Sequence, residues 1–253
     1  MKITGNTIVI TGGGSGIGKA LAEALHKRGN QIIIAGRRKQ ALDSVTAANP
    51  GMKGLVLDIQ APASIKEFAT RLAREFPTTN VVINNSGIMR PENLAAAQED
   101  VSDAEAMIST NLLGPIRLNN ALLPLLKKQP RSTIMMVSSG LAFVPLTMTP
   151  TYCATKAAIH SYSESLRFQL KDSTIEVLEL IPPYVATELM GEQQAKDSRA
   201  MPLDEFITEV MQILETQPSA IEICVQRVKP LRFAAESDNY EAVFRGLQAM
   251  VPH

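Results

Sequence analysis

The sequence predicts a single-domain α/β fold, in which a doubly wound sheet of seven parallel strands is flanked by helices on both faces. Short apolar runs rich in Val, Ile and Leu alternate with longer amphipathic stretches along the chain. The short runs are almost continuously apolar, as are strands that are buried on both faces. The 253 residues, 45% of them hydrophobic, suffice for one large domain with a buried core. We therefore expect one domain over residues 1–253.

The elements follow in strict alternation, which predicts a parallel sheet with right-handed crossovers. The expected strands are Thr7–Thr11, Gln31–Ala35, Gly54–Asp58, Asn80–Asn84, Ser132–Ser138, Ile175–Ile181 and Ile221–Val225. The expected helices are Gly16–Lys27, Lys39–Ala48, Ala63–Glu75, Asp103–Leu126, Thr151–Lys171 and Leu203–Glu215. The least regular segments should be 91–100, 184–202 and the end of the chain from Lys229 onward.

Composition narrows the class of function. Equal numbers of basic and acidic residues give a formal net charge of zero, which provides no support for a nucleic acid or an anionic membrane as partner. No stretch reaches the roughly 18 apolar residues of a membrane span, and the first apolar run is too short for a signal peptide. Cys153 and Cys224 lack metal-ligand spacing, so we expect free thiols, no metal and a cytoplasmic location.

The stretch TIVITGGGSGIGKALAEAL places glycines between the first strand and its helix. Unpaired N–H groups and the positive helix end favour an anion there, and missing Cβ atoms let a phosphate approach. The spacing is Gly12-x-x-x-Gly16-x-Gly18, rather than the usual G-x-G-x-x-G of dinucleotide sites. The turn predicts a Rossmann-type nucleotide site, with an ordinary loose turn as the alternative. Its candidate cofactor-binding residues are Gly12, Gly14, Ser15, Gly16, Ile17 and Gly18.

The end of the second strand bears on the choice of cofactor. An NAD site places an acid about 20 residues after the glycines, to bind the adenosine ribose. Gly36, Arg37 and Arg38 stand there instead, and arginine suits a 2′-phosphate. The sequence favours NADP, with NAD still possible, unless the two arginines are only a solvated turn. Asp58, at the end of the third expected strand, is a candidate contact for the adenine.

Five motifs, in order, resemble those of the short-chain dehydrogenase/reductase family. They are TGGGSGIG from Thr11, NNSG from Asn84, NLLG from Asn111, the serine of MVSSG before YCATK from Tyr152, and IPPYVAT from Ile181. The whole also resembles the DltE-like oxidoreductase subgroup. Pro183 stands where the family usually has glycine, and proline fixes φ and removes an N–H. The resemblance adds a set of expected cofactor contacts: Ile59, Asn85, Ser86, Gly87, Tyr152, Lys156, Pro182, Val185 and Thr187.

The resemblance implies a catalytic set of Asn111, Ser139, Tyr152 and Lys156. Tyr152 and Lys156 are four residues apart on an expected helix, so they share a face. A neighbouring ammonium, with an oxidised nicotinamide, should lower the pKa of the phenol and allow general acid/base work. Family spacing selects Ser139 rather than Ser138 to hold the substrate oxygen. The family's asparagine kinks its helix and helps to hold a water.

The substrate should be a small carbonyl or alcohol compound. Its candidate contacts are Ser139, Leu141, Tyr152 and Tyr184, within an apolar lining of Leu141, Phe143, Val144, Leu146, Met148, Tyr184, Leu189 and Met190. Within a substrate-loop region of about 184–202, the polar connection 190–201 is predicted to be a lid over the site, with a disordered surface loop as the alternative. Arg227, Lys229 and Arg232 should form a solvated face, with a site for an anionic substrate as the alternative. The helices 103–126 and 151–171 carry surplus apolar residues, which predicts a homodimer or homotetramer, as is common in the family.

Two functions remain open. The first is an NADP(H)-dependent oxidoreductase that interconverts a carbonyl and an alcohol by hydride transfer, with Tyr152 as general acid/base. The second is a catalytically silent nucleotide-binding sensor or scaffold. A silent relative would be free to lose Ser139, Tyr152 or Lys156, so their joint presence favours the enzyme.

Overall fold

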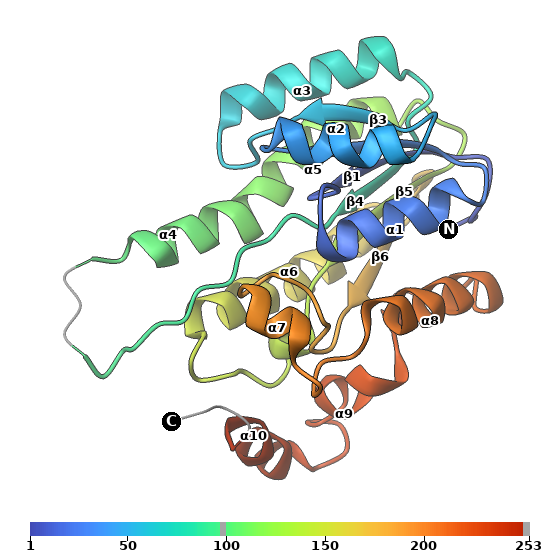
Figure 1. Ribbon diagram of the computed structural model, residues 1–253. Helices are drawn as coiled ribbons and strands as arrows, with labels where there is room; N and C mark the ends of the chain where they lie inside the picture. The colour runs from blue at the N-terminus through green and yellow to red at the C-terminus, as the bar shows by residue number, and fades with distance from the viewer. Residues whose placement is uncertain (97–99, 250–253) are drawn as a thin grey trace.

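A computed structural model describes residues 1–96 and 100–249, and a single parallel sheet lies at its centre (Figure 1). The strands are β1 (Thr7–Thr11), β2 (Gln31–Gly36), β3 (Lys53–Val56), β4 (Val81–Asn84), β5 (Ser132–Val137), β6 (Ile175–Ile181) and β7 (Glu222–Cys224). They pair in the order β3-β2-β1-β4-β5-β6-β7. The expected doubly wound, seven-stranded sheet is confirmed. The order reverses between β1 and β4, which is where ligands bind in open α/β sheets.

The helices occupy the segments between the strands. They are α1 (Gly16–His26), α2 (Lys39–Ala48), α3 (Pro62–Glu75), α4 (Ser102–Ile108), α5 (Gly114–Leu126), α6 (Pro150–Gln169), α7 (Glu192–Lys196), α8 (Leu203–Thr216), α9 (Lys229–Arg232) and α10 (Tyr240–Gln248). Short turns η1 (Ser109–Leu113), η2 (Gly140–Ala142) and η3 (Gln226–Val228) join some of them. No helix in the described part of the chain is both long and apolar enough to cross a membrane.

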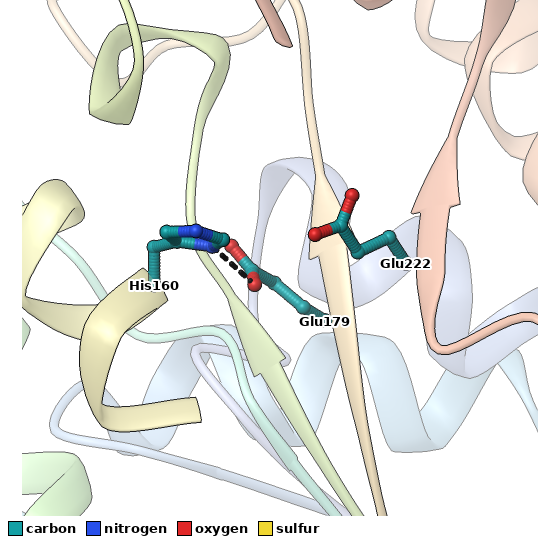
Figure 2. Close-up of side chains that lie close together, drawn as sticks. All are labelled: His160, Glu179 and Glu222. Carbon is teal, nitrogen blue, oxygen red and sulfur yellow. Dashed lines mark hydrogen bonds and ion pairs between the residues drawn. The ribbon is translucent and has the colours of Figure 1, made fainter. Parts of the chain in front are cut away.

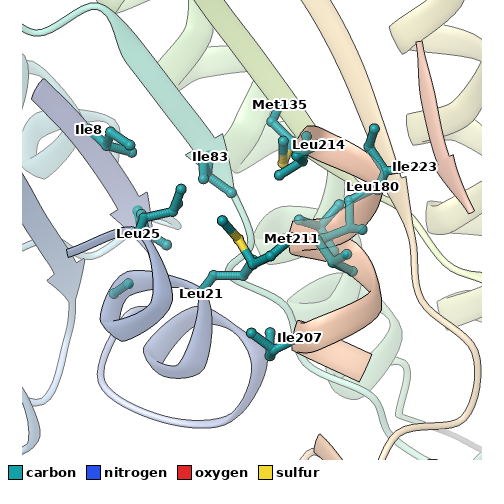
Figure 3. Close-up of a cluster of buried hydrophobic side chains, with 14 of the residues drawn as sticks. Ile8, Leu21, Leu25, Ile83, Met135, Leu180, Ile207, Met211, Leu214 and Ile223 are labelled. Carbon is teal, nitrogen blue, oxygen red and sulfur yellow. The ribbon is translucent and has the colours of Figure 1, made fainter. Parts of the chain in front are cut away.

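Alternate side chains of the strands build two cores, one on each face of the sheet. In β1, Ile8 and Ile10 enter one core and Val9 enters the other, and all three are fully buried. Helices α1 and α8 cover the first core, in which Leu21 and Leu25 meet Ile207, Met211 and Leu214 (Figure 3). Helices α3, α5 and α6 cover the second core.

The helix expected over 103–126 is interrupted. Helix α4 passes into the π-helical turn η1, and α5 begins only at Gly114. A Cβ at Gly114 would lie 2.6 Å from Ile59 Cγ1, so only glycine lets this turn pack so closely. Pro115 follows, and a proline at the start of a helix needs no N–H partner. The insertion lies at Asn111, and π turns inside helices often mark functional sites.

The carboxyl-terminal part is more ordered than the sequence suggested. The segment from Lys229 onward was expected to be irregular, but it contains α9 and α10. Gln248 of α10 accepts hydrogen bonds from the Thr147 N–H and hydroxyl, which fastens α10 to the segment before α6. The segment 184–202 contains α7 and a bridge between Val185 and Met201. The last four residues of the expected domain lie outside the described residues.

The pairing of β6 with β7 has a consequence for charge. Glu179 of β6 lies directly beside Glu222 of β7 in the parallel register, and Figure 2 shows both carboxylates near His160 of α6. Glu179 is fully buried, although it stands in the middle of a strand. Such a residue needs partners for its charge.

Candidate active site

The glycine turn joins β1 to α1 at the reversal of strand order. Gly12 and Gly16 have φ of +68° and +52°, in the left-handed region that favours glycine. A Cβ at Gly18 would lie 2.5 Å from the Gly12 carbonyl oxygen and closer still to Asn85 Nδ2. A Cβ at Gly13 would lie 2.6 Å from Ile34 Cβ. At these positions it is therefore the chain's own atoms that exclude a side chain, besides any phosphate.

The same turn has the chemistry of an anion site. Ser15 caps α1 without a side-chain cap hydrogen bond, and the first turn carries no acidic residue. The first N–H groups and the positive helix end are thus left for a ligand. Arg38 extends from the end of β2 and donates to Ser15 Oγ at 3.2 Å, which adds a cation at the helix end. These features fit the phosphates of a dinucleotide. Of the two arginines, Arg38 is the one whose guanidinium reaches Ser15 at the start of α1.

Other expected cofactor residues gather around the turn. A Cβ at Gly16 would lie 3.7 Å from Thr187, so the segment after β6 lies against the turn. The Thr11 hydroxyl accepts the N–H groups of Asn85 and Ser86 at 3.0 Å, which holds the end of β4 beside β1. The remaining expected residues have contacts within the protein itself. Asp58 accepts the Gln60 N–H, and the Pro182 carbonyl accepts the Gly140 N–H. Ile17 and Ile59 pack into the two cores, and Val185 is buried.

Four polar side chains expected to be catalytic lie buried at the carboxyl ends of β4 and β5. Asn111, Ser139, Tyr152 and Lys156 are each at most 7% exposed. Lys156 Nζ lies 5.6 Å from the centre of the Tyr152 ring and donates to the Val137 carbonyl at 2.8 Å. Tyr152 is hydrogen-bonded to Ser139, whereas the Ser138 hydroxyl binds Glu179. The structure therefore brings Ser139, and not Ser138, to the tyrosine.

Asn111 links two segments of this site. Its Oδ1 accepts the Ile88 N–H at 2.9 Å, and its Nδ2 donates to the Ile88 carbonyl at 2.9 Å and to Thr155 Oγ1 at 3.2 Å. A Cβ at Gly87 would lie 3.5 Å from Asn111 Oδ1 and 3.8 Å from Lys156 Nζ. The π turn thus ties the chain after β4 to helix α6, next to the lysine.

Burial dominates the titration of the site. Desolvation raises the pKa of Tyr152, against the hydrogen bond to Ser139 that lowers it. Desolvation lowers the pKa of Lys156 to about 8, and the charge of Glu179 opposes that fall. The protein's own groups therefore shift the pKa of Tyr152 upward, opposite to the expected direction. The positive charge of an oxidised nicotinamide was part of that expectation and is not among these groups.

An apolar cluster surrounds Tyr152. It combines buried Met89, Met107 and Cys153 with Ile88, Leu141, Leu146, Leu189 and Met190. Four of the residues expected to line the pocket are there, but Phe143 instead stacks edge-on against His160, with ring centres 4.7 Å apart. Tyr184 is also outside the cluster, because it is 44% exposed and its hydroxyl donates to Asp197 at 3.2 Å. Burial raises the pKa of the Cys153 thiol, as befits a packing residue.

The short chain dehydrogenase family profile matches residues 6–198. The chain is also 36% identical over 247 residues to the uncharacterised oxidoreductase DltE of Bacillus subtilis strain 168, covering 96% of this chain and 97% of that protein. The chain belongs to the short-chain dehydrogenase family. An uncharacterised oxidoreductase of Staphylococcus aureus strain MRSA252 is 28% identical over 231 residues, covering 90% of this chain and 99% of its own length.

Solved structures of short-chain dehydrogenases share the whole fold. One from Burkholderia cenocepacia J2315, in complex with NADP, matches with a TM-score of 0.81 and 25% identity over 100% of both chains. Another, from Sphingobium yanoikuyae in complex with NADPH, matches with a TM-score of 0.79 and 26% identity over 98% of this chain and 96% of that chain. This short-chain dehydrogenase is thus a single Rossmann-like domain, as the sequence predicted.

Sequence reasoning missed a charged network beside the catalytic set. His160 Nδ1 lies 2.9 Å from Glu179 Oε2, and Arg232 of α9 donates to both oxygens of Glu222 at 2.7 and 3.0 Å. Arg232 is only 15% exposed in its side chain, so it does not belong to the solvated face expected for it. The spacing of these residues in the sequence carries no signal, because β6, β7, α6 and α9 bring them together. The carboxylate oxygens of Glu179 and Glu222 already bind Ser138, His160 and Arg232. The positive charge of Arg232 would also repel a metal ion.

Proposed function

We propose that the protein is an NADP(H)-dependent oxidoreductase that interconverts a carbonyl and an alcohol. The convergence of Ser139, Tyr152 and Lys156 at the carboxyl end of the sheet, beside its switch point, is the observation that carries this proposal. NADP is bound in one related structure and NADPH in another. A carbonyl reduction requires a hydride donor, a proton donor and a group that holds the oxygen. A bound nicotinamide supplies the hydride.

The chain's own residues supply the rest. Ser139 Oγ, beside the phenol, donates a hydrogen bond that orients the substrate oxygen. Tyr152 gives its proton to that oxygen during reduction and takes it back during oxidation. Lys156, as an ammonium, favours the phenolate that remains. Asn111 holds Ile88 and Thr155 in place and so fixes the floor of the site. A catalytically silent sensor would need none of this arrangement.

The apolar cluster around Tyr152 supports a substrate with an aliphatic or aromatic body next to its carbonyl. The substrate would lie between the segment 88–89, the segment 141–146 and the segment 189–190, which all contribute to that cluster. These segments offer a substrate apolar side chains, so we expect neutral carbonyl compounds to be preferred over acids. A panel of aldehydes and ketones, followed by NADPH absorbance, ranks the candidates.

The test of the proposal is Tyr152→Phe. Loss of a general acid typically costs on the order of 10²–10⁴ in rate. We expect kcat to fall by that factor while NADPH still binds, measured by steady-state kinetics and by titration of nucleotide fluorescence. A variant that keeps nearly the wild-type kcat on the best substrate of the panel would refute the assignment of Tyr152.

We also propose that the protein works as a homodimer or homotetramer in the cytoplasm. Phe168 on the outer side of α6 is 69% exposed, and Leu113 before α5 is 37% exposed, which supports a partner surface along these two helices. Sedimentation at micromolar concentration checks the proposal, and a purely monomeric protein would contradict it.

A further inference from the structure

Glu179 is a fully buried carboxylate that touches three elements of the fold. It lies on β6, its Oε1 accepts a hydrogen bond from the Ser138 hydroxyl at the end of β5, and its Oε2 binds His160 on α6. Ser138 directly precedes Ser139, and His160 lies one helical turn after Lys156. Both partners of Glu179 are therefore neighbours of candidate catalytic residues.

Two of these elements, β5 and α6, also hold the lysine in place. Lys156 Nζ donates to the carbonyl of Val137, the residue before Ser138. The segment 137–139 thus binds Lys156 through its first residue, Glu179 through its second and Tyr152 through its third. A shift of the β5 end against α6 would disturb all three contacts together. Glu179 connects the end of β5 with α6 through its bonds to Ser138 and His160.

We propose that Glu179 is a positioning residue for the proposed oxidoreductase reaction: through Ser138 and His160 it fixes the end of β5 against α6, and it provides a buried negative charge that acts on Lys156. This inference rests on the proposed function, because it concerns how the catalytic set is held. Glu179 makes its hydrogen bonds to Ser138 and His160, and not to Tyr152 or Ser139, so it acts through its partners.

Electrostatics agrees with the geometry. Glu179 raises the pKa of Lys156 against the desolvation that lowers it to about 8, and its hydrogen bond raises the pKa of His160. Other titratable groups lie around His160, Glu179 and Lys156. Glu164 on α6, Glu222 on β7 and Glu236 after α9 interact with His160, Cys224 on β7 interacts with Glu179, and the Tyr152 ring lies beside Lys156. Arg232 is held by Glu222 and Glu236, so it does not neutralise Glu179.

The sign of the expected change follows directly. Replacing the Glu179 carboxylate with an amide removes a negative charge that stabilises the Lys156 ammonium, so the pKa of the lysine falls. If the reaction needs the ammonium, kcat then begins to fall at a lower pH as the pH is raised. The alkaline limb of the profile of kcat against pH therefore shifts to lower pH. A purely structural role for Glu179 would reduce the amount of active protein without moving that limb.

The experiment compares Glu179→Gln with Glu176→Gln. Glu176 lies on the same strand but at its amino end, where it binds the chain's amino terminus at 3.0 Å and Thr133 at 2.8 Å. For Glu179→Gln we expect a kcat roughly 10- to 100-fold lower, an unchanged NADPH affinity and an alkaline limb lower by about one pH unit. Glu176→Gln should keep the wild-type kcat and limb. Glu179→Asp, which keeps the charge, should lose kcat without moving the limb.

A readout that needs no turnover keeps the two proposals apart. The titration of Lys156 is followed by NMR of protein labelled with ¹³Cε-lysine, with the signal assigned through Lys156→Arg. A lower midpoint in Glu179→Gln supports the inference even if no carbonyl compound of the panel is reduced. An unchanged Lys156 titration, or a kcat and limb equal to those of Glu176→Gln, overturns it.

A smaller variant covers the case in which Glu179→Gln does not fold. Ser138→Ala removes only the hydroxyl that links Glu179 to β5. We expect a kcat several-fold lower, in the range of roughly 3 to 10, with the Lys156 titration and the NADPH affinity unchanged. Full wild-type kcat in Ser138→Ala would show that the contact does not position the site, and would overturn the inference.

Discussion

The two halves of the sheet handle polar groups in opposite ways. In the first half, from residue 1 to the start of β4, the buried polar side chains are the uncharged Asn6, Thr11, Asn30 and Thr79. In the second half, the described residues include two buried charged side chains, Lys156 and Glu179. The first half therefore depends on the size and backbone conformation of its residues, and the second half depends on charge.

This difference follows from what each half must do. A phosphate can be bound by backbone N–H groups and a helix end, which need close approach and no buried ion. Proton transfer instead needs side chains whose pKa responds to their surroundings, and burial makes that response large. Substitutions should accordingly act through steric conflict in the first half and through pH dependence in the second.

The largest effect in the first half should come from Gly18→Ala. The new Cβ would stand 2.5 Å from the Gly12 carbonyl oxygen, a backbone atom that moves only if the turn moves. We expect a loss of about 2–3 kcal/mol in the free energy of unfolding and a weaker NADPH site, with an unchanged pH profile of kcat. Urea unfolding and nucleotide titration measure the two.

Gly246→Ala is the matched control for this prediction. A Cβ at Gly246, inside α10, meets nothing within 4 Å. Because alanine is the better helix former, this variant should gain about 0.5–1 kcal/mol. Equal effects of the two substitutions would show that crowding does not govern the glycine turn.

The sequence revealed contacts that are local and left out those that are not. The glycine turn and the pair Tyr152 and Lys156 could be recognised because each lies within one strand–helix junction or one helical turn. The contact of Ser138 with Glu179 spans 41 residues, and that of His160 with Glu179 spans 19. No periodicity encodes such pairs, since they depend on the order of the strands.

The ends of elements show the same limit. The third strand was expected to reach Asp58 but ends at Val56. Asp58 instead accepts the Gln60 N–H in the turn before α3, a local hydrogen bond typical of aspartate after a strand. Helix α9 was missed because four residues are too few to show a helical period, and α10 was missed although its nine residues carry an amphipathic pattern.

A smaller effect is expected from the charges at the rim of the first half. Arg38 lies at the helix end beside Ser15, where it suits a 2′-phosphate. Arg38→Asp should weaken NADPH by about 1.5–3 kcal/mol and leave NADH affinity nearly unchanged, because hydrogen bonds to charged groups are of that size. Arg37→Asp should act in the same direction but less strongly.

Titration of each variant with both nucleotides measures the preference. The two arginine variants also test the contrast between the halves of the sheet. They show whether charged side chains in the first half matter only through the 2′-phosphate of a bound nucleotide. If the ratio of NADPH to NADH affinity stays at its wild-type value in both variants, the arginines are a solvated turn and the cofactor preference has another origin.

The smallest effect of a substitution is expected in the segment 184–202, which follows β6 and contacts the glycine turn through Thr187. Gln194 of α7 is buried, and its Nε2 donates to the Val185 carbonyl at 2.8 Å and to Thr187 Oγ1 at 3.2 Å, while its Oε1 accepts the Met190 N–H. One side chain therefore closes the segment on itself. Gln193, next to it, is exposed and serves as the matched control.

We expect Gln194→Ala to loosen this segment without unfolding the sheet. Each lost hydrogen bond contributes about 1 kcal/mol, so trypsin should cut after Lys196 or Arg199 several-fold faster, while Gln193→Ala is cut at the wild-type rate. If the segment is a lid, NADPH with a carbonyl analogue slows cleavage of the wild type, because Thr187 lies against the glycine turn where the nucleotide would bind. Cleavage that ligands leave unchanged would mean that the segment is held by its own contacts, among them those of Gln194 and the bridge between Val185 and Met201. The active site would then keep the same shape with and without ligands, and the segment would not act as a lid.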